Sequence, residues 1–293
     1  MNITYNNTTI PFYGKHLLDL IETSPYRDRA KRDVALDENG IPKTIVASLS
    51  GGCDSAAALY LTAKHFHNID IYPLTFRDVH APKDADAAAE IVEFIKNKFP
   101  FANIREHTIM DYDDKDPVHY VKAQKFIDER PEYKTLNVQQ MSKCNQIDDG
   151  SDEFMARLDR PLRLDGMSAN PPMEVRKQFS TYAMKKFPNF KFDEKNIVRI
   201  NGEARRDTGG KEPELKYNVY KPWVNQSKRF IAHIYNEEGL IEDLYPITRS
   251  CVGGPNQTNN FTEWCWQCFW CYEKAWAFNP FIKYDDNNPF LEF

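Results

Sequence analysis

Short apolar runs rich in β-branched residues alternate along this chain with longer stretches of helical periodicity. The strand-like runs are 45–50, 69–76, 104–110 and 162–166. Between the first three lie an alanine-rich stretch that ends at Phe66 and the amphipathic segment 84–98, with apolar residues at Ala88, Ile91, Val92 and Ile95. Strands and helices that alternate at this spacing form βαβ units. We therefore predict an α/β fold, a Rossmann-like parallel sheet with right-handed crossovers and helices on its faces.

Other segments lie before, between and after these predicted strands and helices. Residues 1–41 precede the first core strand, include a predicted short helix at 16–23, and show no candidate chemistry, which suggests a packing or dimer-contact arm. Residues 111–160 are polar and helix-prone. We expect two or three helices there, broken near Pro131 and Gly150, that form a cap or lid over the ligand site of this domain. Further on, 197–200 and 217–220 resemble strands around a loop, and 226–237 a helix.

These patterns predict three parts of the chain. They are an N-terminal extension (1–41), a nucleotide-binding domain (42–247) with the helical insertion 111–160, and a cysteine-rich C-terminal segment (248–293).

Composition narrows the classes of protein that are possible. Hydrophobic residues make up 41% and charged residues 28% of the 293 residues, as in ordinary globular proteins. The sequence contains no apolar run of membrane-spanning length, and its start has neither a basic segment nor a hydrophobic signal core, so we expect a cytoplasmic protein. A formal charge of −5 argues against a broad nucleic-acid surface and against nucleic acid as a partner.

The first candidate site is the sequence Ser50-Gly51-Gly52-Cys53-Asp54-Ser55, which lies between the first strand and the first helix. The N–H groups at a helix start have no partner within the helix, and the helix dipole is positive there, so phosphates bind at this point. The two glycines let the backbone approach an anion closely. The serines add hydroxyl donors, and Asp54 can cap the helix or hold a magnesium ion.

The carboxyl ends of parallel strands meet at one edge of a sheet, and ligands bind there. This places Phe76 and the backbone around it as an adenine contact, and His80 as either a substrate contact or a solvated loop histidine. Gly166, at the end of the fourth strand, either lets a nucleotide approach closely or is an ordinary turn glycine.

A glycine-containing basic loop spans 202–214 and carries Arg205, Arg206 and Lys211. Such a loop could clamp phosphates or a carboxylate substrate, or it could be a solvated hairpin tip.

Four of the six cysteines lie near the end of the chain, at Cys251, Cys265, Cys268 and Cys271. In a cytoplasmic protein such a cluster favours a metal over disulfides. Two successive C-x2-C steps bring three thiolates to one point, and a fourth from Cys251 closes a tetrahedral set suited to structural zinc. An iron–sulfur cluster remains the alternative, because ferredoxin-type sites also use C-x2-C-x2-C.

The Ser50–Ser55 sequence has no Walker A lysine and resembles instead the SGGxDS signature of the PP-loop, or N-type, ATP pyrophosphatases. The resemblance implies an adenine-nucleotide alpha-hydrolase-like fold, Mg²⁺-ATP as cofactor, and transfer of AMP to a substrate oxygen. It implies ATP contacts from Ser48, Ser50, Gly51, Gly52, Cys53, Asp54, Ser55, Thr75, Phe76 and Gly166, with Asp54 and Ser55 as catalytic residues.

Together with the cysteine set, the chain is most similar to the 7-cyano-7-deazaguanine synthase family of the queuosine pathway. The likeness covers most of 43–278 and rests on 50–55, 74–76, Gly166 and Thr248-Arg249-Ser250-Cys251. It implies a zinc-bearing, C–N bond-forming ligase that uses two ATP to convert 7-carboxy-7-deazaguanine and ammonia into the nitrile. Homodimers are the commonest assembly for such folds, so we expect a homodimer. Arg205 and Arg206, with His80, are then candidate substrate contacts.

Two other functions stay open at this stage. Asn201-Gly202-Glu203-Ala204-Arg205-Arg206-Asp207 and the Pro-Trp at 222–223 resemble phosphoadenosine phosphosulfate reductases, which suggests a sulfur-transferring PP-loop enzyme with an iron–sulfur cluster. Alternatively, ATP is a regulatory ligand, and the basic loop together with the aromatic residues around the cysteine cluster binds nucleic acid.

Overall fold

A six-stranded sheet forms the centre of the protein. The computed structural model describes residues 1–80, 83–113, 115–130, 138–186, 213–251, 253–260 and 262–284. The strand order is β5-β4-β3-β6-β8-β7, and every neighbouring pair except β7–β8 is parallel. The strands are β3 (Thr44–Ser48), β4 (Asp70–Asp78), β5 (Thr108–Tyr112), β6 (Leu162–Asp165), β7 (Glu214–Lys216) and β8 (Val219–Lys221). The predicted α/β fold with a parallel sheet flanked by helices is confirmed.

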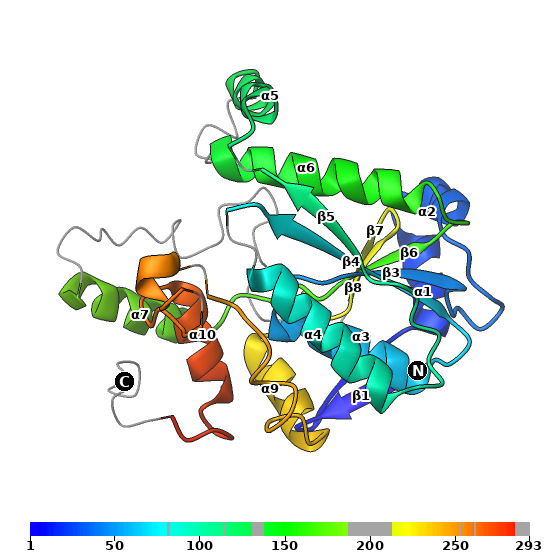
Figure 1. Ribbon diagram of the computed structural model, residues 1–293. Coiled ribbons are helices and arrows are strands. Elements are labelled where there is room, and N and C mark those ends of the chain that lie inside the picture. The colour runs from blue at the N-terminus through cyan, green and yellow to red at the C-terminus, as the bar shows by residue number, and fades with distance from the viewer. Residues whose placement is uncertain are drawn as a thin grey trace.

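Helices cover both faces of this sheet, as the unbroken apolar run of β3 requires. Ile45 and Val46 are both fully buried, but Ile45 packs with α3 (Cys53–His65) and α4 (Lys83–Lys98) while Val46 packs with Met155 of α6 (Val138–Met155). Figure 1 shows α6 along one side of the sheet, with α3 and α4 on the other. The predicted helix at 84–98 is confirmed as α4.

A second group of helices lies beside α3. Helix α9 (Lys228–Glu237) contacts both α3 and α10 (Phe269–Phe278), and α7 (Met173–Lys186) packs on the other side of α10 (Figure 1). Between α9 and α10 lies a short 3₁₀ turn (Pro255–Gln257). The predicted helix 226–237 is confirmed, with its start at Lys228.

The N-terminal residues belong to the main core. Strands β1 (Asn2–Tyr5) and β2 (Thr8–Pro11) form a hairpin, followed by α1 (Lys15–Thr23) and α2 (Arg27–Asp33). The ring of Phe12 stacks on Trp223 at 5.6 Å between centroids, and both side chains are fully buried. The segment predicted to be a packing arm therefore supplies core side chains.

Several predicted element boundaries differ from the structure, three of them for a clear local reason. The third strand begins at Thr108 because Ile104 pairs with Ile71 while Thr108 pairs with Leu74, and this extra residue interrupts the ladder. Tyr217 takes a left-handed conformation (φ 56°) and turns the chain, so β8 begins at Val219 and its hairpin partner is β7. The predicted strand 197–200 and Pro131 lie outside the described residues.

The third wrong boundary is the helix break expected near Gly150. Gly150 lies inside α6, which runs on to Met155, and α5 (Pro117–Asp128) precedes it. A Cβ at Gly150 would lie 2.7 Å from Cε1 of Phe76, so glycine lets the helix lie close against the sheet.

Among the residues that the structure describes, we find no helix with the length and apolarity needed to cross a membrane.

Candidate nucleotide and metal sites

The Ser50–Gly52 turn lies at the carboxyl end of β3. On one side of β3 the sheet continues with β4 and β5, and on the other side with β6, β8 and β7. This is the switch point at which open parallel sheets bind ligands. Gly51 has φ +73°, and a Cβ there would lie 2.4 Å from the carbonyl oxygen of Asp84. Glycine is therefore required at this position. Gly52 is the N-cap of α3, and the exposed Ser50 lies beside the start of that helix.

The serine hydroxyls of this turn differ in their surroundings. Oγ of Ser55 donates to the Gly52 carbonyl at 3.1 Å and lies 3.4 Å from Oγ of Ser50. Ser48 lies lower on β3, where its hydroxyl accepts from Nε of Arg163 at 3.0 Å. Of the candidate ATP-binding hydroxyls, those of Ser50 and Ser55 thus lie together at the helix start.

Asp54 joins the turn to two distant parts of the chain. Its Oδ2 accepts from the Ser168 hydroxyl at 2.6 Å, and its Oδ1 accepts from Nζ of Lys228 at 2.7 Å. The side chain of Lys228 is only 8% exposed and also lies 3.7 Å from the carboxylate of Glu273. The sequence analysis did not identify Lys228, because one lysine at the start of an amphipathic helix resembles a solvated one.

Cys53 packs in the core and is not available as a reactive thiol. Its side chain is fully buried, and this burial raises the pKa of the thiol to about 12. It is therefore a protonated thiol at neutral pH, and the site contains no activated nucleophile at the position between Gly52 and Asp54.

The structure places the other predicted ligand contacts around the same edge of the sheet. Thr75 is buried in β4, and its hydroxyl lies 2.8 Å from Nε2 of His107. Phe76 packs beneath α6, among Val46, Met110 and Met155. His80 is exposed beyond β4, with Nε2 3.1 Å from the carboxylate of Asp113. Arg205 and Arg206, with Lys211, lie outside the described residues.

Gly166 follows β6 and lies directly against the start of α3. A Cβ there would lie 2.5 Å from Cα of Ser55 and 2.6 Å from the Asp54 carbonyl oxygen. We expect Gly166→Ala to push the Asp54–Ser55 backbone away and to lower the free energy of unfolding by about 1–3 kcal/mol. Thermal unfolding measures this loss. The alanine variant of Gly254, where a Cβ would have nothing within 4 Å, is the control; equal stability of the two variants would contradict the close contact.

Charged side chains surround the turn on its solvent side. Asp84 lies in the first turn of α4. Desolvation by the surrounding protein raises the pKa of its carboxyl to about 6, although the side chain reaches solvent, while Lys143 and Arg249 act in the opposite direction. Lys143 comes from α6 and Arg249 from the segment before Cys251. Charges of opposite sign from three parts of the chain thus lie near one another beside the glycine turn. The sequence analysis did not identify Lys143, and it named Arg249 only as part of the segment that leads to Cys251, not as a charged group near the turn.

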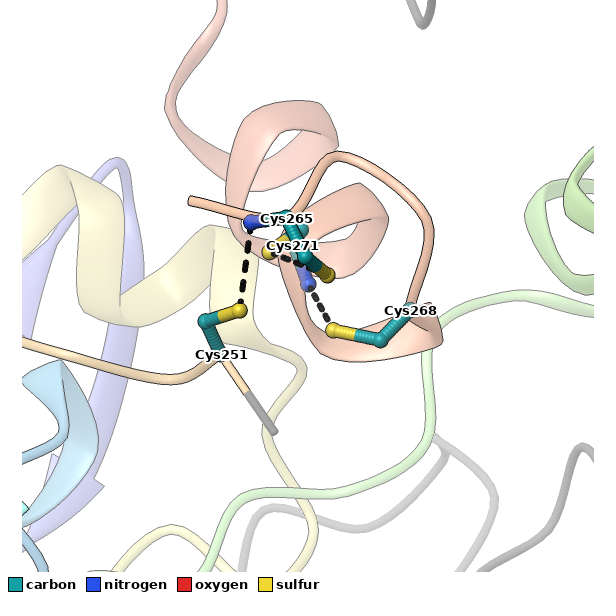
Figure 2. Close-up of side chains that lie close together, drawn as sticks. All are labelled: Cys251, Cys265, Cys268 and Cys271. Atoms are coloured by element: carbon teal, nitrogen blue, oxygen red, sulfur yellow. Dashed lines mark hydrogen bonds between the residues drawn. The ribbon is translucent and has the colours of Figure 1, made fainter. Parts of the chain in front are cut away.

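The four C-terminal cysteines converge, as Figure 2 shows. Their sulfur atoms all lie within 4.8 Å of one another, and those of Cys265 and Cys271 are 3.9 Å apart. Four thiolates bound to one zinc ion at about 2.3 Å would be about 3.8 Å apart in a tetrahedron. The donor set and its spacing therefore fit a single metal ion.

Backbone N–H groups stabilise these sulfurs. Cys265 and Gly253 donate to Sγ of Cys251 at 3.3 Å, and Cys271 donates to Sγ of Cys268 at 3.4 Å. A Cβ at Gly253 would lie 2.6 Å from Cβ of Cys265, so the loop needs glycine there. The neighbouring thiols, first that of Cys251, lower the pKa of Cys265. The cluster thus favours a thiolate, the form that binds metal.

The two candidate sites touch each other. The backbone N–H of Arg249 donates to the carbonyl of Gly51 at 2.7 Å, and the Arg249 carbonyl oxygen lies 3.3 Å from where a Gly52 Cβ would be. Two residues later the chain reaches Cys251. A single short segment therefore joins the glycine turn to the cysteine cluster.

Comparisons with known proteins give loose likenesses. No family model matches this chain, and no curated protein matches it. One similar solved structure is the NMN synthetase from Francisella tularensis, with TM-score 0.38 and 12% identity over 94% of this chain and 100% of that one. Another is the U34-tRNA thiolase NcsA from Methanococcus maripaludis with its 4Fe–4S cluster, with TM-score 0.37 and 13% identity over 81% of this chain and 68% of that one. Similarities this weak assign no function.

Proposed function

We propose that the protein is a PP-loop enzyme that uses ATP to adenylate a carboxylate on a small heterocycle, after which ammonia displaces AMP. The observation that carries this proposal is the Ser50–Ser55 sequence, which lies at the start of α3 and at the switch point of the sheet. The four-cysteine cluster joined to it narrows the proposal to a 7-cyano-7-deazaguanine synthase-like ligase. A cytoplasmic homodimer remains part of the proposal.

The proposed chemistry is electrostatic. The start of α3 and the hydroxyls of Ser50 and Ser55 would bind the β,γ-pyrophosphate, and Asp54 would help to hold Mg²⁺, which neutralises charge on the leaving pyrophosphate. Lys228 holds the Asp54 carboxylate in place. Fixed donors of this kind stabilise the developing charge without reorganising during the reaction.

The reaction balances without a redox partner. The carboxylate attacks the α-phosphorus of ATP and releases pyrophosphate, and ammonia then replaces AMP to give the amide. For the nitrile, the amide oxygen attacks a second ATP, and loss of AMP completes the dehydration. Each adenylation thus yields one AMP and one pyrophosphate, so the amide costs one ATP and the nitrile two. The chain needs no covalent nucleophile, in agreement with the buried thiol of Cys53.

For the metal we propose zinc in a structural role. In a 4Fe–4S cluster each cysteine binds a different iron, so the four sulfurs lie outside a cage of atoms and farther apart than the ligands of one ion. Sulfur atoms that all lie within 4.8 Å fit one ion better. Residues Cys251, Cys265, Cys268 and Cys271 would hold it, and the expected protein is colourless with one zinc per chain.

The experiment that tests the proposed function is a mass-spectrometric assay with Mg²⁺-ATP, 7-carboxy-7-deazaguanine and ammonium. We expect AMP to form in step with amide or nitrile product, one AMP for the amide and two for the nitrile. Omission of the deazaguanine should abolish AMP formation. ATP binding without turnover would overturn the proposed acceptor, and visible absorption of an iron–sulfur cluster would overturn zinc.

A further inference from the structure

Helix α10 carries two charged residues into the interior, two and three positions after the last cysteine of the cluster. Glu273 is 2% exposed and Lys274 is 1% exposed. Burial of a charge at this depth is costly unless partners compensate it. Both residues have such partners, and both partners belong to the surroundings of the glycine turn.

Glu273 acts toward the turn through Lys228. Its Oε2 lies 3.7 Å from Nζ of Lys228, and the same ammonium donates to Oδ1 of Asp54 at 2.7 Å. The three groups form a row of alternating charge, buried at Glu273 and Lys228 and partly exposed at Asp54, with α9 supplying the central cation. Without Glu273, the ammonium of Lys228 would lose one of its anions, and its position between α9 and α3 would be less defined.

Lys274 acts toward the turn by a second path. Its Nζ donates to the carbonyl of Thr248 at 2.7 Å and lies 2.8 Å from the Thr248 hydroxyl, above the rings of Tyr245 and Trp264. The next residue, Arg249, donates its N–H to the carbonyl of Gly51. Lys274 therefore fixes the segment that supports the turn.

Both paths begin at the metal centre. Cys268 caps α10 and Cys271 lies in its first turn, while Cys251 follows the segment held by Lys274. A metal ion bound by these cysteines would join the two paths at one end, and the glycine turn joins them at the other.

We propose that Glu273 is a positioning residue for ATP binding: through Lys228 it orients the Asp54 carboxylate, and so couples the metal centre to the nucleotide site. This inference rests on the proposed function only in taking ATP as the ligand of the turn, and it is independent of the acceptor.

The test is Glu273→Gln, which keeps the shape of the side chain and removes its charge. We expect the affinity for Mg²⁺ with α,β-methylene-ATP, measured by titration calorimetry without acceptor, to fall by roughly 5- to 150-fold, the usual range of coupling between sites. Zinc content should remain one per chain. Glu273→Asp, which keeps the charge, should recover part of the affinity.

The matched control is Tyr272→Phe, one residue earlier on the same helix. The Tyr272 hydroxyl donates to Gln178 of α7, away from the turn. This variant should bind the nucleotide as the wild type does. A double-mutant cycle between Glu273→Gln and Lys228→Met should show non-additive losses, because both changes act on one row of charges.

Each outcome is decisive. Unchanged affinity in Glu273→Gln, additive losses in the cycle, or loss of zinc together with affinity would overturn the inference, the last because Glu273 would then only hold the metal centre. If the glutamine variant does not fold, unchanged affinity in Glu273→Asp overturns it. A wild type that binds no ATP analogue overturns the proposed function as well, whereas binding without turnover overturns only the acceptor.

Discussion

Replacing Asp54 with asparagine is expected to lower the rate of AMP formation by about 10²–10³, the loss seen when one preorganised electrostatic group is removed from a site. The carboxylate has two structural partners, Ser168 on one oxygen and Lys228 on the other. Asparagine keeps the size but removes the charge that would hold Mg²⁺ and that compensates the buried ammonium. We expect Asp54→Ala to abolish AMP formation, with the fold intact in both variants.

The assay follows AMP by mass spectrometry at saturating ATP, with circular dichroism as the check on the fold. Asp111→Asn is the matched control, because Asp111 is exposed on β5 and pairs with Arg77 at the surface. It should keep wild-type activity. Wild-type AMP formation in Asp54→Asn or Asp54→Ala would refute the assignment of this site.

Replacing Cys268 with serine is expected to remove the metal and a large part of the thermal stability together. Cys268 precedes α10, and its sulfur accepts the N–H of Cys271 at 3.4 Å. Metal binding contributes free energy to folding, so its loss should cost several kcal/mol and lower Tm on the order of 10 °C. Elemental analysis and calorimetry on the same sample measure both quantities.

The control for this variant is Cys144→Ser, which changes a half-buried cysteine of α6 that lies outside the cluster. It should retain one zinc per chain and nearly all of its stability. A Cys268→Ser protein that kept both its metal and its Tm would show that the four cysteines do not form a structural centre.

The parallel sheet could be predicted from the sequence because its signals are local. Ile45 and Val46 are neighbours buried on opposite faces, and an unbroken apolar run is the pattern that such a strand requires. Element ends were predicted less well. The left-handed backbone at Tyr217 has no strong local signal, since the usual residue for that conformation is glycine or asparagine.

The candidate site divides in the same way. The glycines of the turn and the spacing of the cysteines are short motifs, and both could be found without a structure. Lys228 and Glu273 could not, because they are 174 and 219 positions from Asp54 and reach it only after the sheet and its helices are assembled. Burial gives these charges their importance, and burial is a property of the complete fold.

The stacking of Phe12 on Trp223 has a consequence for how the chain acquires its structure. Tyr5 likewise donates its hydroxyl to Glu238 at 2.7 Å. During synthesis Tyr5 and Phe12 must therefore wait for more than two hundred further residues before these two partners exist. Contacts of such long sequence separation slow folding and leave apolar surface exposed in the meantime. We expect the nascent chain to depend on chaperones until its last third emerges.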